Sequence, residues 1–392
     1  MAGIGDAHLR PADEVLLRVE NLVVEFPAGR RGQKVHAVTD VSLDVKEGET
    51  LGLVGESGCG KSTTGKAIMQ LPPPTSGHVW FSDRDRRTTS PGETLDETTA
   101  GDAVTNGVPN PNGSSTAGTV TTEPVARNDL TATKGETLRR LRTQIQMIFQ
   151  DPISSLNPRR RIEEIISEGL NIWKVGNKQG RVAKVNELLL TVGMDPEVVK
   201  GRRPHQFSGG QCQRISIARA VATEPKLIIC DEPVSALDVS VQAQILNLLE
   251  DMKAQYGLTM IFIAHDLAVV KNISDRVAVM YLGRLCEVGD PDVLYARPAH
   301  PYTVALLGAI PVPDPSIRPE DRHILGGEIP SPVSPPSGCR FRSRCPRADD
   351  VCASDVPEMM LVEGSPDHYV ACHHPMAEGE TLTPVDITGV TV

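Results

Sequence analysis

The sequence has no apolar run long enough to cross a bilayer, which takes roughly 18 or more consecutive apolar residues. Its first residues, MAGIGDAHLRPADE, lack the basic and then apolar pattern of a signal peptide. The chain also lacks the positive charge typical of general nucleic-acid binders, because its formal net charge is −10. We therefore expect a cytosolic protein without nucleic-acid partners, whose role at a membrane would depend on other subunits.

Apolar residues make up 39% of the 392 residues and charged residues 23%, which is typical of one large globular domain with appendages. Eight cysteines are present. Four are scattered through the first 290 residues, and four cluster near the end. A cytosolic setting argues against disulfides, so the cluster needs another explanation.

Short apolar strands alternate with helical patterns along most of the chain, which predicts a largely parallel sheet flanked by helices. The strands are expected at 50–55, 144–149, 226–231, 259–264, 276–282 and 284–289. The helices are expected at 61–70, 162–172, 181–192, after 208, and at 240–255 and 266–273. Two longer strands within 15–46 and a strand at 78–81 predict an additional antiparallel β element.

Residues 83–134 interrupt this alternation. They are rich in Thr, Gly, Asn, Pro, Ser and Asp, and they contain no Phe, Tyr, Trp or Ile. Such a segment cannot bury enough apolar surface to offset the entropy lost on ordering. The composition therefore predicts a disordered insertion.

The segment GESGCGKST at 55–63 matches GxxxxGK(S/T) between a strand and a helix. Glycines allow the backbone to wrap around phosphates, and the free N–H groups at the helix start point at the anion. The lysine would reach the β- and γ-phosphates and the serine hydroxyl would bind Mg²⁺. The expected nucleotide-binding residues are Gly55, Glu56, Ser57, Gly58, Cys59, Gly60, Lys61, Ser62 and Thr63.

The apolar strand KLIICD ends in Asp231 and is followed by Glu232. We expect Asp231 to hold Mg²⁺ and Glu232 to orient and deprotonate an attacking water. His265 follows the apolar strand TMIFIA, so it lies at the carboxyl end of a parallel strand, where α/β sheets place ligands. These residues predict ATP hydrolysis.

A second helix start suited to an anion lies at SGGQCQR. Ser208 is a good N-cap, and Gly209 and Gly210 leave N–H groups exposed next to Gln211. One domain does not need two such sites for one nucleotide. The sequence therefore predicts a head-to-tail dimer in which each copy closes on the nucleotide of the other.

The segments GESGCGKST, FQDP, SGGQCQR, CDEPVSALD and IAHD, in this order, resemble the ABC transporter ATPase domain over residues 15–290. The resemblance implies that Gln150 contacts Mg²⁺ and senses a permease. It also implies that Asp238 communicates across the dimer and that His265 bonds the γ-phosphate. Phe26 is the candidate for stacking on adenine, although a buried strand aromatic is an equal alternative.

Two later segments, FQDPISSLNPRRRIEEII and the tail RPAHPYTVALLGAIPVPDP followed by GCRFRSRCP, resemble ATPase subunits of oligopeptide and dipeptide importers. The nickel importers belong to the same larger group. This resemblance implies import of peptide-like cargo. Alternatives are a nickel or other small-solute importer, a soluble ABC protein outside transport, and a binding module without ATPase activity.

The clustered cysteines are Cys339, Cys345, Cys352 and Cys372. Thiols at this density in a reducing compartment favour a metal site. Resemblance to importer subunits implies a 4Fe-4S iron–sulfur cluster, with Zn²⁺ as the main rival and free thiols as a third alternative. Arg340, Arg342, Arg344 and Arg347 would balance the charge of a ligated cluster or would simply be solvated.

The expected fold is thus an α/β P-loop core with an antiparallel β subdomain, a helical signature subdomain around 155–220 and a Cys-rich tail. The ATPase domain would span 15–290, the C-terminal extension with its metal site 291–376, and a flexible tail 377–392. The expected partners are a second ATPase subunit, identical or homologous, two membrane-spanning permease subunits and, indirectly, an extracytoplasmic substrate-binding protein. Such a subunit would lie at the cytoplasmic face of the plasma membrane.

Overall fold

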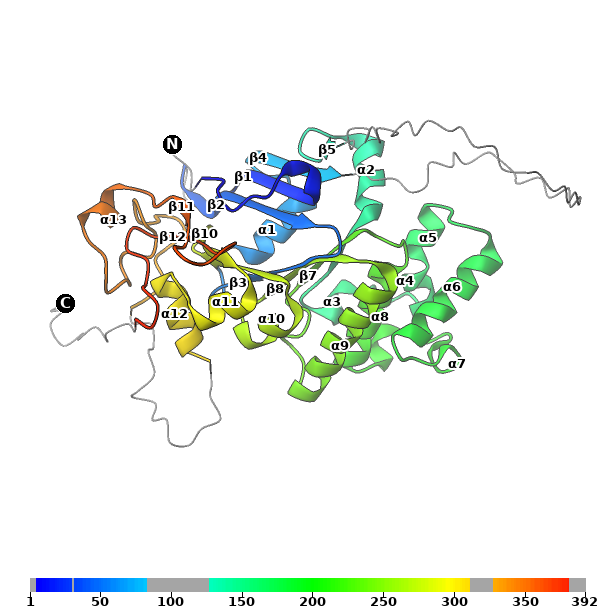
Figure 1. Ribbon diagram of the computed structural model, residues 1–392. Helices are drawn as coiled ribbons and strands as arrows, with labels where there is room; N and C mark the ends of the chain where they lie inside the picture. Colours follow the sequence, from blue (N-terminus) through cyan, green and yellow to red (C-terminus); the bar gives the residue numbers. More distant parts are fainter. Residues whose placement is uncertain (1–4, 30–31, 83–126, 311–326, 381–392) are drawn as a thin grey trace, which may run out of the picture.

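The computed structural model describes residues 5–29, 32–82, 127–310 and 327–380. In these ranges a large mixed sheet and a smaller antiparallel sheet are surrounded by helices (Figure 1). One group of helices lies at one end of the large sheet, and residues 327–380 lie at the other end. None of the described helices is both long and apolar enough to cross a membrane.

The large sheet has eight strands in the order β11-β12-β10-β9-β3-β8-β7-β6. Strands β9, β3, β8, β7 and β6 are parallel, whereas β10, β12 and β11 join the β9 edge antiparallel. The strands are β3 (Thr50–Val54), β6 (Ile145–Ile148), β7 (Leu227–Asp231), β8 (Thr259–Ala264), β9 (Arg276–Tyr281), β10 (Arg284–Gly289), β11 (Met359–Leu361) and β12 (Tyr369–Ala371).

The central strands are apolar on both faces because helices cover both sides of the sheet. In β7, Leu227 and Ile229 enter one core cluster, and Ile228 and Cys230 enter the other. This alternation follows the two-residue period of a strand. Because β9, β3, β8, β7 and β6 run parallel, their carboxyl ends meet at one edge of the sheet.

The antiparallel sheet has the order β2-β1-β4-β5. Its strands are β1 (Val15–Pro27), β2 (Lys34–Lys46), β4 (Ser76–Ser82) and β5 (Arg127–Asp129). Helix α1 (Lys61–Ile68) contacts both β1 and β2 of this sheet and β7 and β8 of the large one, so it lies between the two sheets. Helix α10 (Leu267–Ile273) covers the opposite face of the large sheet, against β3 and β8.

Helix α8 (Gly209–Val221) is the centre of the helical group, because α3, α4, α6 and α9 all contact it. Its neighbours are α3 (Pro152–Ser155), α4 (Ile162–Ile166), α5 (Glu168–Ile172), α6 (Lys178–Thr191), α7 (Pro196–Val199) and α9 (Val239–Tyr256). The remaining helices are η1 (Ala12–Glu14), α2 (Gly135–Gln144), η2 (Pro204–Gln206), α11 (Pro291–Ala296), α12 (Pro301–Gly308) and α13 (Asp350–Ser354).

The predicted disordered insertion, 83–134, extends too far at its end. Residues 83–126 lie outside the described residues, but β5 pairs with β4 from Arg127 to Asp129. Leu130 is buried in the core cluster beneath the antiparallel sheet. The polar composition concealed this edge strand because strand pairing is made by backbone groups and needs few apolar side chains.

The chain beyond Pro298 is rich in Pro, Gly and Cys, a composition that predicts an extended tail held by its cysteines, but the structure contains regular elements there. Helix α12 begins at Pro301, and β12 adds to the large sheet through Glu287 and Val288 of β10. The predicted flexible tail, 377–392, stays a prediction. Residues 377–380 form a turn in which the Ala377 N–H donates to Glu380, while residues 381–392 lie outside the described part of the chain.

Candidate nucleotide site

The predicted phosphate-binding residues, 55–63, form the turn between β3 and α1 and the first residues of that helix. Gly55 has φ +151°, and an added Cβ would lie 2.1 Å from the Met280 carbonyl oxygen. Gly60 has φ +108°, and its Cβ would lie 2.3 Å from the Ala37 carbonyl oxygen. Both positions therefore require glycine, because any side chain would collide with the backbone of a neighbouring strand.

Lys61 is buried inside this turn. Its Nζ donates to the carbonyl oxygen of Gly55 at 2.7 Å and to that of Glu56 at 3.0 Å. The Cys59 sulfur lies 3.8 Å from the same Nζ, and burial raises the pKa of this thiol even though Lys61 opposes the shift. Two backbone carbonyl oxygens of the loop thus hold the Lys61 ammonium group, so that a bound anion would contact it.

Ser62 and Asp231 come together from α1 and β7. The Ser62 hydroxyl donates to Asp231 Oδ1 at 2.5 Å, and Lys66 Nζ lies 3.6 Å from Asp231 Oδ2. A hydroxyl and a carboxylate side by side next to a phosphate-binding loop are suitable ligands for Mg²⁺. The two predicted magnesium ligands are therefore neighbours.

Glu232 lies where the carboxyl ends of β6, β7 and β8 meet. Its Oε2 accepts a hydrogen bond from Gln150 Nε2 at 3.0 Å and lies 3.4 Å from His265 Nδ1. Glu232 also has φ +46°, an unfavourable backbone conformation for a non-glycine residue that is found most often at functional sites. Gln150 and His265, predicted from separate motifs, thus both lie next to the carboxylate of Glu232, which was predicted from a third.

Ser208 and Asp238 line a separate hollow of about 300 Å³, together with Gly209, Gly210 and Gln211. Ser208 caps α8, since its hydroxyl accepts from the Gln211 N–H and the Gln211 side chain accepts from the Ser208 N–H. Among the described residues, no hydrogen bond joins this turn to the phosphate-binding loop. The structure therefore groups the predicted signature residues with Asp238 and keeps them apart from Lys61.

Phe26 lies near the end of β1, opposite Val35 of β2. Its side chain is partly buried against the core cluster beneath the antiparallel sheet. Strand β2 also supplies the Ala37 carbonyl that borders Gly60. Phe26 is thus on a strand that borders the loop, and its predicted contact with adenine stays a prediction.

Two residues that hold Glu56 were not predicted from the sequence as part of the nucleotide site. Arg344 Nη1 and Nη2 donate to the two Glu56 carboxylate oxygens at 2.7 and 3.1 Å. The Glu56 N–H donates to the Tyr302 hydroxyl at 2.8 Å. The arginine was expected to balance a metal cluster or to be solvated, and instead it is 4% exposed and paired within the loop. Only the arginine-rich spacing within GCRFRSRCP could have drawn attention to it.

The four clustered cysteines surround one small cavity, which His300, Arg342, Arg347, His373 and His374 also line. All four thiols are free. Burial and the neighbouring cysteines raise the pKa of Cys345 to about 11 and that of Cys372 to about 12, although backbone N–H groups oppose the shift. Sulfur donors are ligands that suit a thiolate-bound metal, but no three of these four sulfur atoms lie within 4.8 Å of one another.

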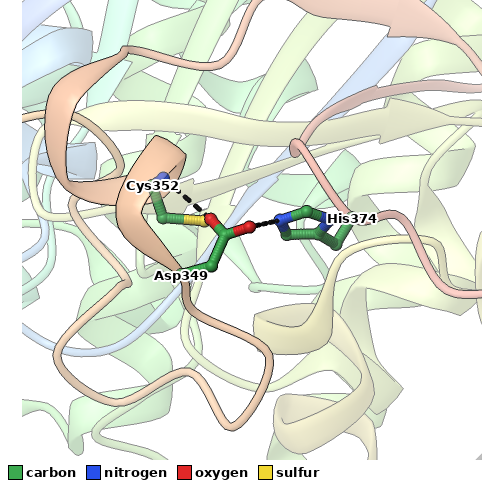
Figure 2. Close-up of side chains that lie close together, drawn as sticks. All are labelled: Asp349, Cys352 and His374. Carbon is green, nitrogen blue, oxygen red and sulfur yellow. Dashed lines mark hydrogen bonds and ion pairs between the residues drawn. The ribbon is translucent and has the colours of Figure 1, made fainter.

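A tighter group, drawn in Figure 2, includes two residues that line this cavity, Cys352 and His374. Asp349, Cys352 and His374 each offer an atom within 4.8 Å of the others, the only such trio among the described residues. However, Asp349 Oδ1 accepts from the Cys352 N–H at 3.1 Å and Oδ2 lies 2.8 Å from His374 Nε2. Asp349 thus serves as the N-cap of α13, and both of its oxygens are already engaged.

Comparison with known proteins adds two family matches and close relatives. Residues 38–235 match the family described as ABC transporter, and residues 286–352 match the oligopeptide/dipeptide transporter C-terminal region. The oligopeptide transport ATP-binding proteins OppF of Salmonella typhimurium and Escherichia coli are each 46% identical over 370 residues, covering 92% of this chain and 96% of the relative.

The fold is similar to that of solved ATP-binding cassettes. One is a cassette solved as a dimer bound to ADP and phosphate, with a TM-score of 0.54 and 24% sequence identity. The match covers 70% of this chain and 98% of the chain of that cassette. At this identity the likeness concerns the fold alone. It confirms the expected P-loop α/β core with a mixed sheet.

Proposed function

The chain belongs to the ABC transporter family and carries the C-terminal region of oligopeptide/dipeptide transporters, and from this we propose that it hydrolyses ATP to energise peptide import. The observation that carries the ATPase is the meeting of Gln150, Glu232 and His265 beside the loop that holds Lys61. The cargo class follows from the C-terminal match and from the relatives.

In the proposed mechanism, Lys61 and the N–H groups of the loop hold the phosphates. Ser62 and Asp231 would hold Mg²⁺, which neutralises charge on the β- and γ-phosphates. Glu232 orients and deprotonates the water, and His265 donates to the γ-phosphate from the adjacent strand. To contact the bound ligand, Gln150 would give up its hydrogen bond to Glu232. Binding of the ligand would in this way change the position of Gln150 and of the surface residues that follow β6.

We further propose that the Ser208–Gln211 turn and Asp238 complete the site of a second ATPase subunit. The turn has exposed N–H groups at a helix start, and it makes no hydrogen bond to its own phosphate-binding loop among the described residues. ATP binding would close two such chains head to tail, and hydrolysis would reopen them. The motion would pass to two permease subunits, with this chain bound peripherally at the cytoplasmic face of the membrane.

The chain would divide at about residue 290 into an ATPase domain, 15–290, and a C-terminal extension, 291–376. The two family matches, at 38–235 and 286–352, support this division. The extension shares the large sheet through the pairing of β12 with β10. It would therefore act as a fixed part of the ATPase and not as an independent module.

The Glu232→Gln variant tests the ATPase. It should abolish turnover but keep ATP binding, because the amide keeps the shape of the side chain and removes the base. With ATP it should accumulate as a closed dimer, measured by size-exclusion chromatography with light scattering. Glu250→Gln, an exposed position on α9, is the matched control. Turnover by Glu232→Gln near the wild-type rate would contradict the assignment.

Uptake measurements test the cargo. Cells that carry only Lys61→Ala should lose uptake of short labelled peptides and keep uptake of free amino acids. Loss of nickel uptake with peptide uptake intact would instead favour the nickel-importer alternative. Unchanged uptake of both, with the chain absent from membrane fractions, would favour a soluble ABC protein.

We also propose that Cys339, Cys345, Cys352 and Cys372 bind a 4Fe-4S cluster, supported by the shared cavity that the four thiols line. The chain purified without oxygen should contain iron and acid-labile sulfide, and Cys345→Ala should lose both. Cys212→Ala, a buried cysteine of α8, is the control. Stoichiometric zinc without iron would refute the cluster.

A further inference from the structure

Two residues of the C-terminal region form hydrogen bonds with Glu56 of the phosphate-binding loop. Glu56 donates its N–H to Tyr302 of α12 and accepts two hydrogen bonds on its carboxylate from Arg344. Neither partner belongs to the nucleotide motifs, and both lie more than 240 residues further along the chain, at separations of 246 and 288. The first half of the loop is therefore held by residues from outside the ATPase core.

Arg344 is well placed to fix the Glu56 carboxylate. Its side chain is 4% exposed, and its two bonds form a fork on both oxygens, the strongest geometry for such a pair. Its guanidinium also lies 5.8 Å from the centre of the Tyr281 ring and contacts the Tyr281 hydroxyl. The arginine thus has one defined position above the end of β9.

The segment that carries Arg344 is itself firmly anchored. Arg340 donates to the Leu282 carbonyl oxygen and, at 2.9 Å, to the Thr39 hydroxyl. Phe341 packs edge-on against Tyr281, with ring centres 5.2 Å apart, and lies 5.4 Å from the Tyr302 ring. The position of Arg344 is therefore fixed by contacts of its own segment as well as by its pair with Glu56.

We propose that Arg344 is a positioning residue for ATP binding, through which the C-terminal region sets the nucleotide affinity of the phosphate-binding loop. The proposal rests on the proposed ATPase function and deepens it. A carboxylate inside a loop that binds a polyanion is unfavourable unless it is neutralised. Arg344 neutralises the Glu56 carboxylate, while the Glu56 N–H donates to Tyr302 and its carbonyl oxygen accepts from Lys61.

The test compares four variants of the full-length chain: Arg344→Gln, Arg344→Lys, Glu56→Gln and the double variant Glu56→Gln/Arg344→Gln. The dissociation constant of Mg·ADP is measured by calorimetry, and KM and kcat for ATP by steady-state kinetics. Arg160→Gln is the matched control, because Arg160 donates to the Glu168 carboxylate at 2.7 Å in an exposed pair beside α4 and α5. Thermal unfolding reports any loss of stability.

Arg344→Gln should weaken Mg·ADP binding and raise KM roughly ten-fold, with a smaller change in kcat, because an unpaired carboxylate remains beside the phosphates. Arg344→Lys should recover part of the affinity. The double variant should bind much more tightly than Arg344→Gln, since removing both charges removes the repulsion. This recovery is the signature of a positioning role, which a purely structural arginine would not give.

Equal affinities for Arg344→Gln, Arg160→Gln and the wild type would overturn the proposal. So would a double variant as weak as Arg344→Gln. If Arg344→Gln does not fold, the Arg344→Lys and double variants still decide the outcome. A wild-type chain that does not bind Mg·ADP at all would instead contradict the proposed ATPase, which separates the two failures.

Discussion

At the residue scale, Glu232 is the proposed catalytic base. Its backbone is held in an unfavourable conformation by the hydrogen bond from its own N–H to the Ile263 carbonyl oxygen at 3.0 Å. Its carboxylate meets Gln150 and His265. A side chain on a fixed backbone loses little freedom when it orients a water molecule, so the strain at Glu232 favours a defined geometry.

A second residue-scale consequence concerns pH. Burial lowers the pKa of His8, whose Nε2 lies 2.8 Å from the Ser42 carbonyl oxygen. Arg276 lowers it further, whereas the Ser42 contact, Asp44 and Asp6 oppose the shift. The unfolded chain therefore binds a proton at His8 more readily than the folded chain does. This contribution to stability is complete above the ordinary histidine pKa of about 6.5 and is lost as the pH falls below it.

We expect His8→Gln to flatten the pH dependence of the unfolding free energy between about pH 7.5 and about pH 5.5, by at most about 1.4 kcal/mol per pH unit. The glutamine amide can still donate to Ser42. Urea unfolding at a series of pH values measures the slope, and His205→Gln, an exposed histidine, is the control. An unchanged slope in His8→Gln would assign the effect to other groups.

The sequence could place Lys61, Glu232 and His265 in one region because Glu232 and His265 lie directly after strands of a predicted parallel sheet and Lys61 follows another such strand after one turn. The carboxyl ends of such strands meet at one edge. It could not place Arg344 against Glu56. That contact depends on the path of the chain between α12 and the cysteines, and no local pattern of residues records that path.

At the scale of secondary-structure elements, β10 and β12 are joined by a buried polar contact as well as by their backbones. Glu287 of β10 accepts from the Ala299 and His300 N–H groups at 2.7 and 2.9 Å, and it lies 2.7 Å from His368 Nε2. Both Glu287 and His368 are fully buried. A buried carboxylate with three partners fixes the start of α12 and the approach to β12 together.

His368→Ala should lower the free energy of unfolding by about 2–4 kcal/mol, because the carboxylate loses a partner and a cavity remains. Glu287→Gln should cost less, since the amide oxygen still accepts from the backbone. Urea unfolding measures both, with His78→Ala, at an exposed position on β4, as control. A change of His368→Ala no larger than that of the control would show that the contact adds nothing.

Element prediction was most reliable where apolar periodicity was strong. Strands β7 and β8 are uninterrupted apolar runs, and α9 has its buried residues on one face. Strands β5, β11 and β12 are each only three residues long, which is too short to show a periodic pattern. Such short strands depend on partner strands from elsewhere in the chain, so composition alone suggested disorder at β5 and an extended tail at β11 and β12.

At the scale of the whole molecule, the two largest core clusters both include residues of the large sheet. The C-terminal region extends this sheet beyond β10 through β12 and β11. Tyr302 and Phe341 belong to the same cluster as the helical group at the far end of the sheet. Removal of the C-terminal region would expose the β10 edge, and an unpaired edge strand promotes aggregation.

We therefore expect a chain shortened after Gly289 to be mostly insoluble, because the native state of a protein is stable by only about 5–15 kcal/mol. A chain shortened after Glu380, which keeps every contact described above, should remain soluble and melt like the full chain. Soluble yield, size-exclusion chromatography and thermal unfolding measure the difference. A soluble, monomeric chain ending at Gly289 with the full-length melting temperature would contradict the expectation.

The pairing of Glu56 with Arg344 also has a consequence for synthesis. The two residues are 288 positions apart, so the phosphate-binding loop leaves the ribosome long before its partner does. During that interval the Glu56 carboxylate lacks the counter-charge of Arg344. Contacts between residues so far apart in the sequence form late in folding. A growing chain would therefore gain its full affinity for nucleotide only when translation is nearly finished, and incomplete chains would not compete for permeases as loaded subunits.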